Sequence, residues 1–246
     1  GGGKSWKQGE WLINNDGGFI RRGVFGSALL DVAALLGMNP VRLVVFLQVG
    51  LVLAVAGLTW AAVQRLQPRA TLWLLLIGPG FFVRFWALDL QGGLRKERSA
   101  FLALALLAFA ATRVGSGRVL ALLATVIYLI SIVAHEANIF LAPFVLACLY
   151  LMSRHGQMPT RDVWGAVGLT GLVAGATVLS AFLFRPISAH TPVCAPLLEV
   201  GVAPAMCDGA IAALERPLSG YIATTMGMIL PPRGCAAVRC RLSCRP

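Results

Sequence analysis

Long apolar runs, separated by short charged clusters, are the feature of this sequence that most restricts its fold. Of the 246 residues, 58% are hydrophobic and only 13% are charged, whereas soluble domains are nearer half apolar and a quarter charged. A soluble fold would have too little polar sequence to cover a core of this size. The pattern therefore predicts an all-α, multi-pass transmembrane helical bundle.

Six of these runs have the composition of membrane spans. A bilayer core about 30 Å thick requires about 20 helical residues, and tilt widens that range. The runs cover residues 41–63, 70–88, 99–112, 119–134, 137–152 and 163–184. A seventh begins near Gly220, so we expect six to seven spans. The pair Asn39-Pro40 is a typical cap and first turn for the first of them.

Residues 1–40 are polar to amphipathic and are expected to lie at the membrane interface. Trp6 and Trp11 suit that position, because an indole combines an apolar ring with a polar N–H. Between residues 21 and 38, the spacing of apolar side chains predicts a short amphipathic helix that lies on the membrane. These side chains are Val24, Leu29, Val32, Leu35 and Leu36.

The chain divides into three parts by composition. Residues 1–40 form the interfacial segment, and residues 41–230 form the transmembrane domain, with an external loop at 185–219. Residues 231–246 are rich in Arg and Cys, and we interpret them as a non-native tail on a fragment of a longer protein.

Counting crossings places the polar segments on one side of the membrane. The segments 1–40, 89–98, 135–136 and 185–219 are separated from one another by two spans each. Basic residues fill the opposite side, as expected for short cytoplasmic loops. They are Arg65, Arg69, Arg113, Arg118, Arg154, His155 and Arg161. On the first side, Cys194 and Cys207 flank a proline-rich loop and are candidates for a disulfide, which would place that side outside the cytoplasm.

The first candidate site is the stretch from Asn14 to Gly23. Asp16 is a candidate catalytic base, and Arg21 and Arg22 are candidate phosphate ligands, because guanidinium forks match phosphate oxygens. The alternative is a glycine turn before an amphipathic helix whose arginines contact lipid headgroups.

The second candidate site is the charged loop from Asp89 to Arg98. Arg95 and Lys96 are candidate ligands for a pyrophosphate, with Asp89 or Glu97 as an acid or base. The alternative is a solvated charged turn.

The third candidate is the pair His135-Glu136, at the end of an apolar run. Ionisable groups at membrane depth are costly, which makes this pair a candidate for catalysis and proton transfer. The alternative is a helix-end pair that faces water. The second His of an H-E-x-x-H zinc motif is absent, because Ile139 stands there, and we expect neither a metal nor a cofactor.

The net charge of +11 does not indicate a nucleic-acid binder. Such proteins gather Lys and Arg on a soluble face, whereas here the basic residues separate apolar runs. Membrane lipids and a phosphorylated lipid substrate are the expected partners.

Three short motifs, in this order, resemble those of bacterial polytopic envelope proteins grouped with O-antigen polymerases and other membrane glycosyltransferases that use lipid-linked sugars. The motifs are Asp16-Gly17-Gly18-Phe19-Ile20-Arg21-Arg22-Gly23, Arg95-Lys96-Glu97, and His135-Glu136 followed by Pro143. The resemblance implies a multi-pass protein of a bacterial inner membrane, with an acidic residue in an external loop and basic residues near a lipid pyrophosphate. It assigns Asp16 as the base and places His135 and Glu136 in the same cavity.

The sequence therefore favours a membrane glycosyltransferase or polysaccharide polymerase acting on a polyprenyl-phosphate-linked sugar at the extracytoplasmic face. The alternatives are a transporter or flippase for an anionic lipid or solute, and a non-catalytic scaffold of an envelope complex. Gly78-Pro79-Gly80 interrupts one span, as broken helices do in transporters, but no matching break is visible in a second half of the chain.

Overall fold

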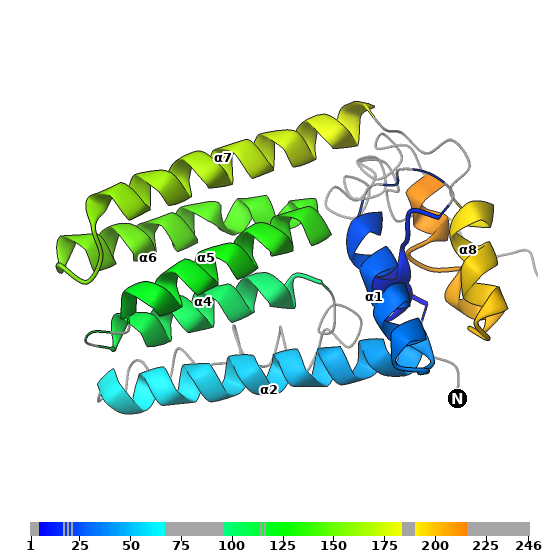
Figure 1. Ribbon diagram of the computed structural model, residues 1–246, viewed down its shortest axis with the longest axis horizontal. Coiled ribbons are helices and arrows are strands. Elements are labelled where there is room, and N and C mark those ends of the chain that lie inside the picture. The colour runs from blue at the N-terminus through cyan, green and yellow to red at the C-terminus, as the bar shows by residue number, and fades with distance from the viewer. Residues whose placement is uncertain are drawn as a thin grey trace, which may run out of the picture.

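A computed structural model describes residues 5–16, 18, 20, 22–66, 96–113, 115, 117–183 and 190–215. Every regular element within these residues is a helix, which confirms the all-α fold class. The helices form two parts, a bundle of long helices and a smaller cap at one end of it (Figure 1).

The bundle runs back and forth along one long axis. Its elements are α2 (Pro40–Leu66), α4 (Arg98–Ala111), α5 (Gly117–Ala134), the 3-10 helix η3 (Glu136–Leu141), α6 (Ala142–Arg154) and α7 (Thr160–Leu183). Helix α4 packs against α2 and α5, and α7 packs against α5 and α6. The α4–α5 interface is built from alanines with no exposed surface, which allows the two helices to approach closely. They are Ala100, Ala103, Ala110, Ala121 and Ala124.

Four helical segments among the described residues are long and apolar enough to cross a membrane. They are Pro40–Arg65, Gly117–Ala134, Glu136–Arg154 and Thr160–Ser180. Five of the predicted six to seven spans fall on this part of the chain, so the prediction is too high there by one. Helix α4 was expected to be a span, but it has 14 residues, fewer than the roughly 20 that crossing requires. The runs expected at 70–88 and from residue 220 lie outside the described residues.

The cap is built from both ends of the described chain. Its elements are the 3-10 helix η1 (Gly9–Leu12), α1 (Gly23–Leu35), α8 (His190–Glu199), η4 (Pro204–Met206) and η5 (Ala212–Glu215). In Figure 1 the blue N-terminal and orange C-terminal segments lie side by side beyond the end of the bundle. A separate apolar core, which includes Trp11, Leu12, Val193, Leu197 and Ile211, holds them together.

Helix α1 forms where the sequence predicted a helix, but the expected amphipathic face is absent. Of the apolar side chains assigned to that face, Leu29 is buried, whereas Val24, Val32 and Leu35 are exposed. The reason is that α1 packs closely through Gly26, where an added Cβ would lie only 1.8 Å from the backbone oxygen of Ile13. Glycine permits this close approach, so the buried side of α1 is set by small residues rather than by large apolar ones.

The junction between α1 and α2 follows the predicted signals. Gly37 has a φ of +60° and ends α1, with the Met38 amide donating to the oxygen of Ala33 at 2.9 Å. Asn39 then caps α2, since its Oδ1 accepts from the Val41 amide at 3.0 Å.

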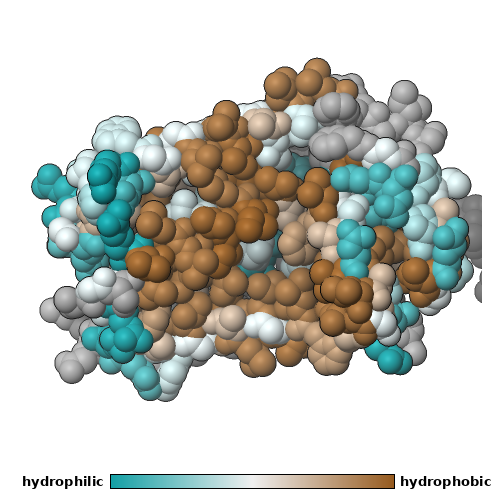
Figure 2. Space-filling model, viewed as in Figure 1, coloured by the Kyte–Doolittle hydropathy of each residue, from teal (hydrophilic) through white to brown (hydrophobic). Residues whose placement is uncertain are grey.

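The two ends of the bundle differ in chemistry. Residues Lys96–Arg98, His135 and Glu136 lie at the cap end, as the crossing count predicted. There Lys96 and Glu136 contact Arg22, and His135 contacts Glu10. At the far end, Arg118 pairs with Asp162 at 2.7 Å. Figure 2 shows an apolar surface over the middle of the bundle and polar surfaces toward its ends, as expected of helices that cross a bilayer.

Candidate functional site

Six ionisable side chains meet where the cap contacts the bundle, and we call them the charged cluster. They are Glu10, Arg22, Lys96, Glu97, His135 and Glu136. Three segments that are remote in sequence supply them: the η1 and α1 region, the start of α4, and the turn between α5 and η3. Such a grouping of charges away from water requires mutual pairing.

His135 is at the centre of the cluster and is held from both sides of its ring. It caps η3, and its Nδ1 accepts a hydrogen bond from the Ala137 amide at 3.1 Å. Its Nε2 lies 3.1 Å from Oε1 of Glu10 and 3.5 Å from Oε1 of Glu97. Because Nδ1 is an acceptor, Nε2 carries the proton and donates it toward the carboxylates.

Arg22 joins the cap to Glu136, which follows His135 in the turn between α5 and η3. Its Nε donates to Oε2 of Glu136 at 2.7 Å and its Nη2 donates to Oε1, which makes the pair bidentate. Its Nη1 lies 3.5 Å from Oε1 of Glu10. Burial opposes the charge of Arg22, but the hydrogen bond and the nearby carboxylates outweigh burial and raise its pKa. Arg22 also has a φ of +70°, the left-handed conformation that side chains rarely adopt.

Lys96 is completely buried in the cluster. Its Nζ donates to the backbone oxygen of Arg22 at 3.1 Å and lies 5.9 Å from the centre of the Phe25 ring. Burial lowers the pKa of Lys96 to about 7, and the attraction of Glu10 only partly offsets burial. Lys96 is therefore able to gain or lose a proton near neutral pH, unlike an exposed lysine.

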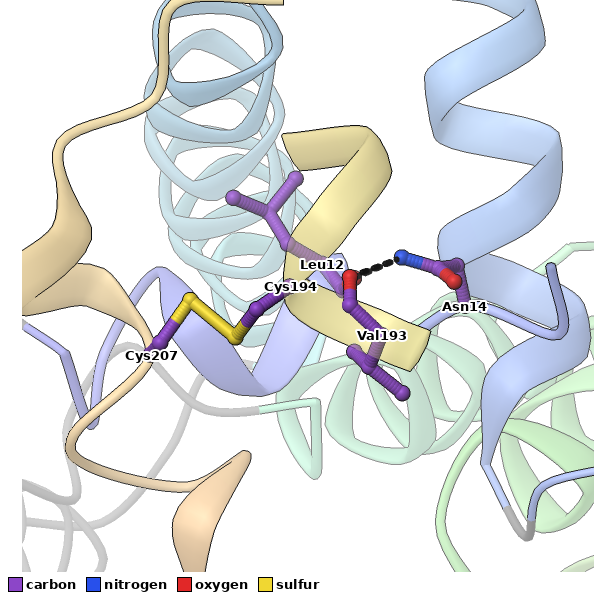
Figure 3. The surroundings of a disulfide bond; sticks show 5 residues. All are labelled: Leu12, Asn14, Val193, Cys194 and Cys207. Atoms are coloured by element: carbon purple, nitrogen blue, oxygen red, sulfur yellow. Dashed lines mark hydrogen bonds between the residues drawn. A yellow bond between two sulfur atoms is a disulfide. The ribbon is translucent and has the colours of Figure 1, made fainter. Parts of the chain in front are cut away.

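A disulfide and a set of buried amides fix the segment that carries Glu10. Cys194 of α8 and Cys207 are bonded, and they are the two cysteines that the sequence analysis proposed to pair. Next to this disulfide, the Nδ2 of Asn14 donates to the backbone oxygen of Val193 at 2.9 Å (Figure 3). On the bundle side, Gln8 donates to Oε1 of Gln48 in α2 at 3.1 Å. The position of Glu10 is thus determined by both parts of the molecule.

A small cavity of about 50 Å³ adjoins the cluster. Arg22 and Glu136 contribute its charged wall, and Thr177 and Ser180 of α7 contribute hydroxyl groups. Its apolar lining consists of Ile20, Val24 and Val133. A cavity of this size holds about one water-sized group, such as a phosphate oxygen or a hydroxyl.

Glu10, Glu97 and His135 also have the composition of a metal site. One ligand atom from each lies within 4.8 Å of the others. Their hydrogen bonds argue against a metal, because a metal would need the lone pair of Nε2, and the Ala137 amide already occupies Nδ1 and leaves the proton on Nε2. The arrangement instead holds the proton of Nε2 between two carboxylates.

The structure gathers five of the predicted site residues, Glu97 among them, and separates one. Arg22, Lys96, His135 and Glu136 are in the cluster, whereas Asp16 is exposed in the loop before α1. Arg21, Arg95 and Asp89 lie outside the described residues. Sequence reasoning missed Glu10, because a single glutamate between Gly9 and Trp11 has no spacing signal that marks it as buried.

No protein-family model matches this chain, and no similar protein was found among curated proteins or solved structures.

Proposed function

We propose that this chain carries the reaction centre of an integral membrane glycosyltransferase or polysaccharide polymerase in a bacterial inner membrane. Its substrate would be a polyprenyl-phosphate-linked sugar, bound at the cap side. The observation that carries the proposal is the charged cluster, where acid–base groups and cations from three remote segments meet at one end of an apolar bundle.

The chemistry requires cations for the departing pyrophosphate and a base for the acceptor hydroxyl. Arg22 borders the small cavity, and its guanidinium is shared with Glu136. A substrate phosphate would therefore displace the Glu136 carboxylate from Arg22, so that binding of the substrate releases that carboxylate. Released Glu136 would then be available near the reacting group.

Asp16 is the proposed base, because its carboxylate is exposed and no ion pair engages it in the described residues. It belongs to the same loop as Arg22, and the loop is closed by a hydrogen bond from the Ile20 amide to Oδ1 of Asn15 at 3.0 Å. An acceptor sugar arriving from water would meet Asp16 first. His135 holds its Nε2 proton between Glu10 and Glu97, and one of these carboxylates would take up the proton deeper in the site.

The test is the surface-glycan profile of a strain in which the full-length gene is deleted and then complemented. Deletion should reduce long glycan chains to short units, and wild type should restore them. Asp16→Asn and His135→Gln should fail to restore them at normal expression. Asp31→Asn is the matched control, because it removes an exposed carboxylate from the neighbouring helix α1. An unchanged profile on deletion would contradict the proposal.

A transporter or flippase for an anionic lipid or solute is the second candidate. It is favoured by the buried contacts of His135 with two carboxylates, one from the cap and one from the bundle, an arrangement that suits proton-coupled movement. The two functions differ in where the lipid-linked unit accumulates after deletion. A transferase defect leaves it on the cap side of the membrane, and a flippase defect leaves it on the opposite side.

A further inference from the structure

A second cavity is remote from the charged cluster. It has a volume of about 500 Å³ and lies between α6 and α7, at the end of the bundle opposite the cap. Figure 1 shows these two helices joined by a short loop at that end. The lining residues are Leu146, Ala147, Tyr150, Ser153, Arg154, Thr160, Val163, Trp164 and Val167.

This cavity, which we call the groove, has one polar end and one apolar end. Ser153, Arg154 and Thr160 lie where α6 ends and α7 begins, whereas Leu146 and Val167 lie about two turns further into the bundle. Both walls belong to segments long and apolar enough to cross a membrane. The groove thus changes from polar to apolar along the direction in which a membrane changes from headgroup to acyl chain.

Two aromatic side chains line the groove about one helical turn inward from its polar end. Tyr150 is 56% exposed and Trp164 is 69% exposed. Exposed aromatic rings with a polar O–H or N–H are typical of the boundary between headgroups and acyl chains. They indicate that the mouth of the groove is at this boundary.

The charge at this end is strongly positive. Within the described residues it carries five arginines and a single carboxylate, Asp162, which pairs with Arg118 at 2.7 Å and lies 3.7 Å from Arg161. Arg65 and Arg113 lie against the Phe109 ring. Arg154, at the rim of the groove, is exposed and has no ion pair among the described residues. An anionic headgroup would supply the missing partner.

We propose that this groove binds an anionic phospholipid, with its phosphate on Arg154 and an acyl chain against Leu146, Val163 and Val167. The lipid comes from the leaflet at the basic end of the bundle. A second copy of the chain would bring like charges to this end, and a soluble partner would not match the apolar length of the groove. The inference does not rest on the proposed function, because the groove and the charged cluster are at opposite ends.

The test uses the full chain purified in nanodiscs of phosphatidylglycerol or of phosphatidylcholine, followed by native mass spectrometry of lipids retained after detergent exchange. Wild type should retain phosphatidylglycerol in preference to phosphatidylcholine. Arg154→Gln should reduce that retention at least about tenfold, the equivalent of about 1.4 kcal/mol, which is near the lower end of the range for a hydrogen bond to a charged group. Ala147→Trp, which fills the groove from an exposed position, should reduce retention of both lipids.

Arg161→Gln is the matched control, because Arg161 is at the same end but does not line the groove. It should retain lipid as wild type does, and all variants should keep the wild-type elution profile and unfolding temperature. Equal losses in Arg154→Gln and Arg161→Gln would show diffuse attraction to a basic surface and overturn the proposal. Loss of a dimer in Ala147→Trp with lipid retention unchanged would show that a second copy occupies the groove, and would also overturn it.

Discussion

The Nε2 atom of His135 lies 3.1 Å from Oε1 of Glu10, and this contact connects the turn between α5 and η3 to the cap. Glu10 is only 2% exposed and also faces Arg22 at 3.5 Å. The cap and the bundle are therefore joined through charged groups as well as through apolar packing. Loss of one such group leaves its buried partners without compensation, which is more costly than the loss of an exposed charge.

Replacement of Glu10 by Gln should lower the free energy of unfolding by about 1–3 kcal/mol, because Arg22 and His135 lose a charged acceptor in a buried site. Thermal unfolding of the purified chain in detergent measures the effect. Glu199→Gln, at an exposed position in α8 of the cap, is the control and should leave the unfolding temperature unchanged. Equal behaviour of the two variants would mean that the Glu10 carboxylate does not stabilise the junction.

The ion pairs at the two ends of the bundle should respond differently to the same type of substitution. Arg22 and Glu136 are 22% and 23% exposed; in the other pair Asp162 is 12% exposed, but its partner Arg118 is 43% exposed and stays in contact with water. Glu136→Gln should cost about 1.5–3 kcal/mol, and Asp162→Asn about 0–1 kcal/mol. Raising the salt concentration from 0.05 to about 0.5 M should weaken only the second effect, since exposed pairs are screened. A larger loss of stability in Asp162→Asn than in Glu136→Gln would contradict this prediction.

The sequence predicted the sidedness of these groups better than their pairing. Apolar runs without charges predicted the helices, and counting the membrane crossings then predicted that His135, Glu136 and Lys96 lie at the same end as Arg22. It did not predict that Glu136 neutralises Arg22, because such contacts depend on side-chain directions that spacing does not encode. The burial of Lys96 was missed for a similar reason, since a run such as Arg95-Lys96-Glu97 is typical of a solvated loop. Helix α4 was misjudged because an apolar run of only 14 residues was counted as a span, although crossing a bilayer requires about 20 residues.

Lys96 should make stability depend on pH above neutrality. Its pKa in the folded chain is about 7, against 10.5 for a free lysine, so the unfolded chain binds more protons between these values. Stability should therefore rise with pH across this window, by at most about 1.4 kcal/mol per pH unit, and the full penalty of burying the charge applies below pH 7. Lys96→Met should remove this dependence.

The measurement is the difference in unfolding temperature between wild type and Lys96→Met at pH 6.5, 8 and 9.5. The unfolding temperature of wild type should rise relative to that of the variant at each increase in pH. Lys7→Met, at a partly exposed position in the cap, controls for the loss of one positive charge. A difference that stays constant with pH would show that the Lys96 ammonium is not desolvated.

Reduction of the Cys194–Cys207 disulfide should destabilise the cap. The two cysteines are separated by 13 residues, and closing a loop of about 15 residues stabilises a fold by roughly 3 kcal/mol. Amide hydrogen exchange before and after reduction should show faster exchange in α8 and η1, with little change in α4 and α5. Cys148→Ser controls for the free thiol found among the described residues. Uniform acceleration throughout the bundle would indicate that the cap and the bundle unfold as one unit.

Gly26 should be the glycine least tolerant of replacement among those in the described helices. An added Cβ would lie 1.8 Å from the oxygen of Ile13 and 2.6 Å from its carbonyl carbon, and these are backbone atoms that cannot rotate away. Gly26→Ala should therefore push α1 off residues 12–13 and cost at least about 1–3 kcal/mol, the usual range for overpacking. Because Arg22 precedes α1, the same shift should weaken its pairing with Glu136.

Gly57→Ala is the matched control, since it makes the same change inside α2 at a position with open space around the added Cβ. It should be neutral or slightly stabilising, because alanine favours a helix more than glycine does. Combining Gly26→Ala with Glu136→Gln separates the two effects. If displacement of α1 already breaks the Arg22 pair, the double variant should lose less stability than the sum of the single variants. Strict additivity would show that α1 shifts without moving Arg22 and that the ion pair is positioned by the bundle alone.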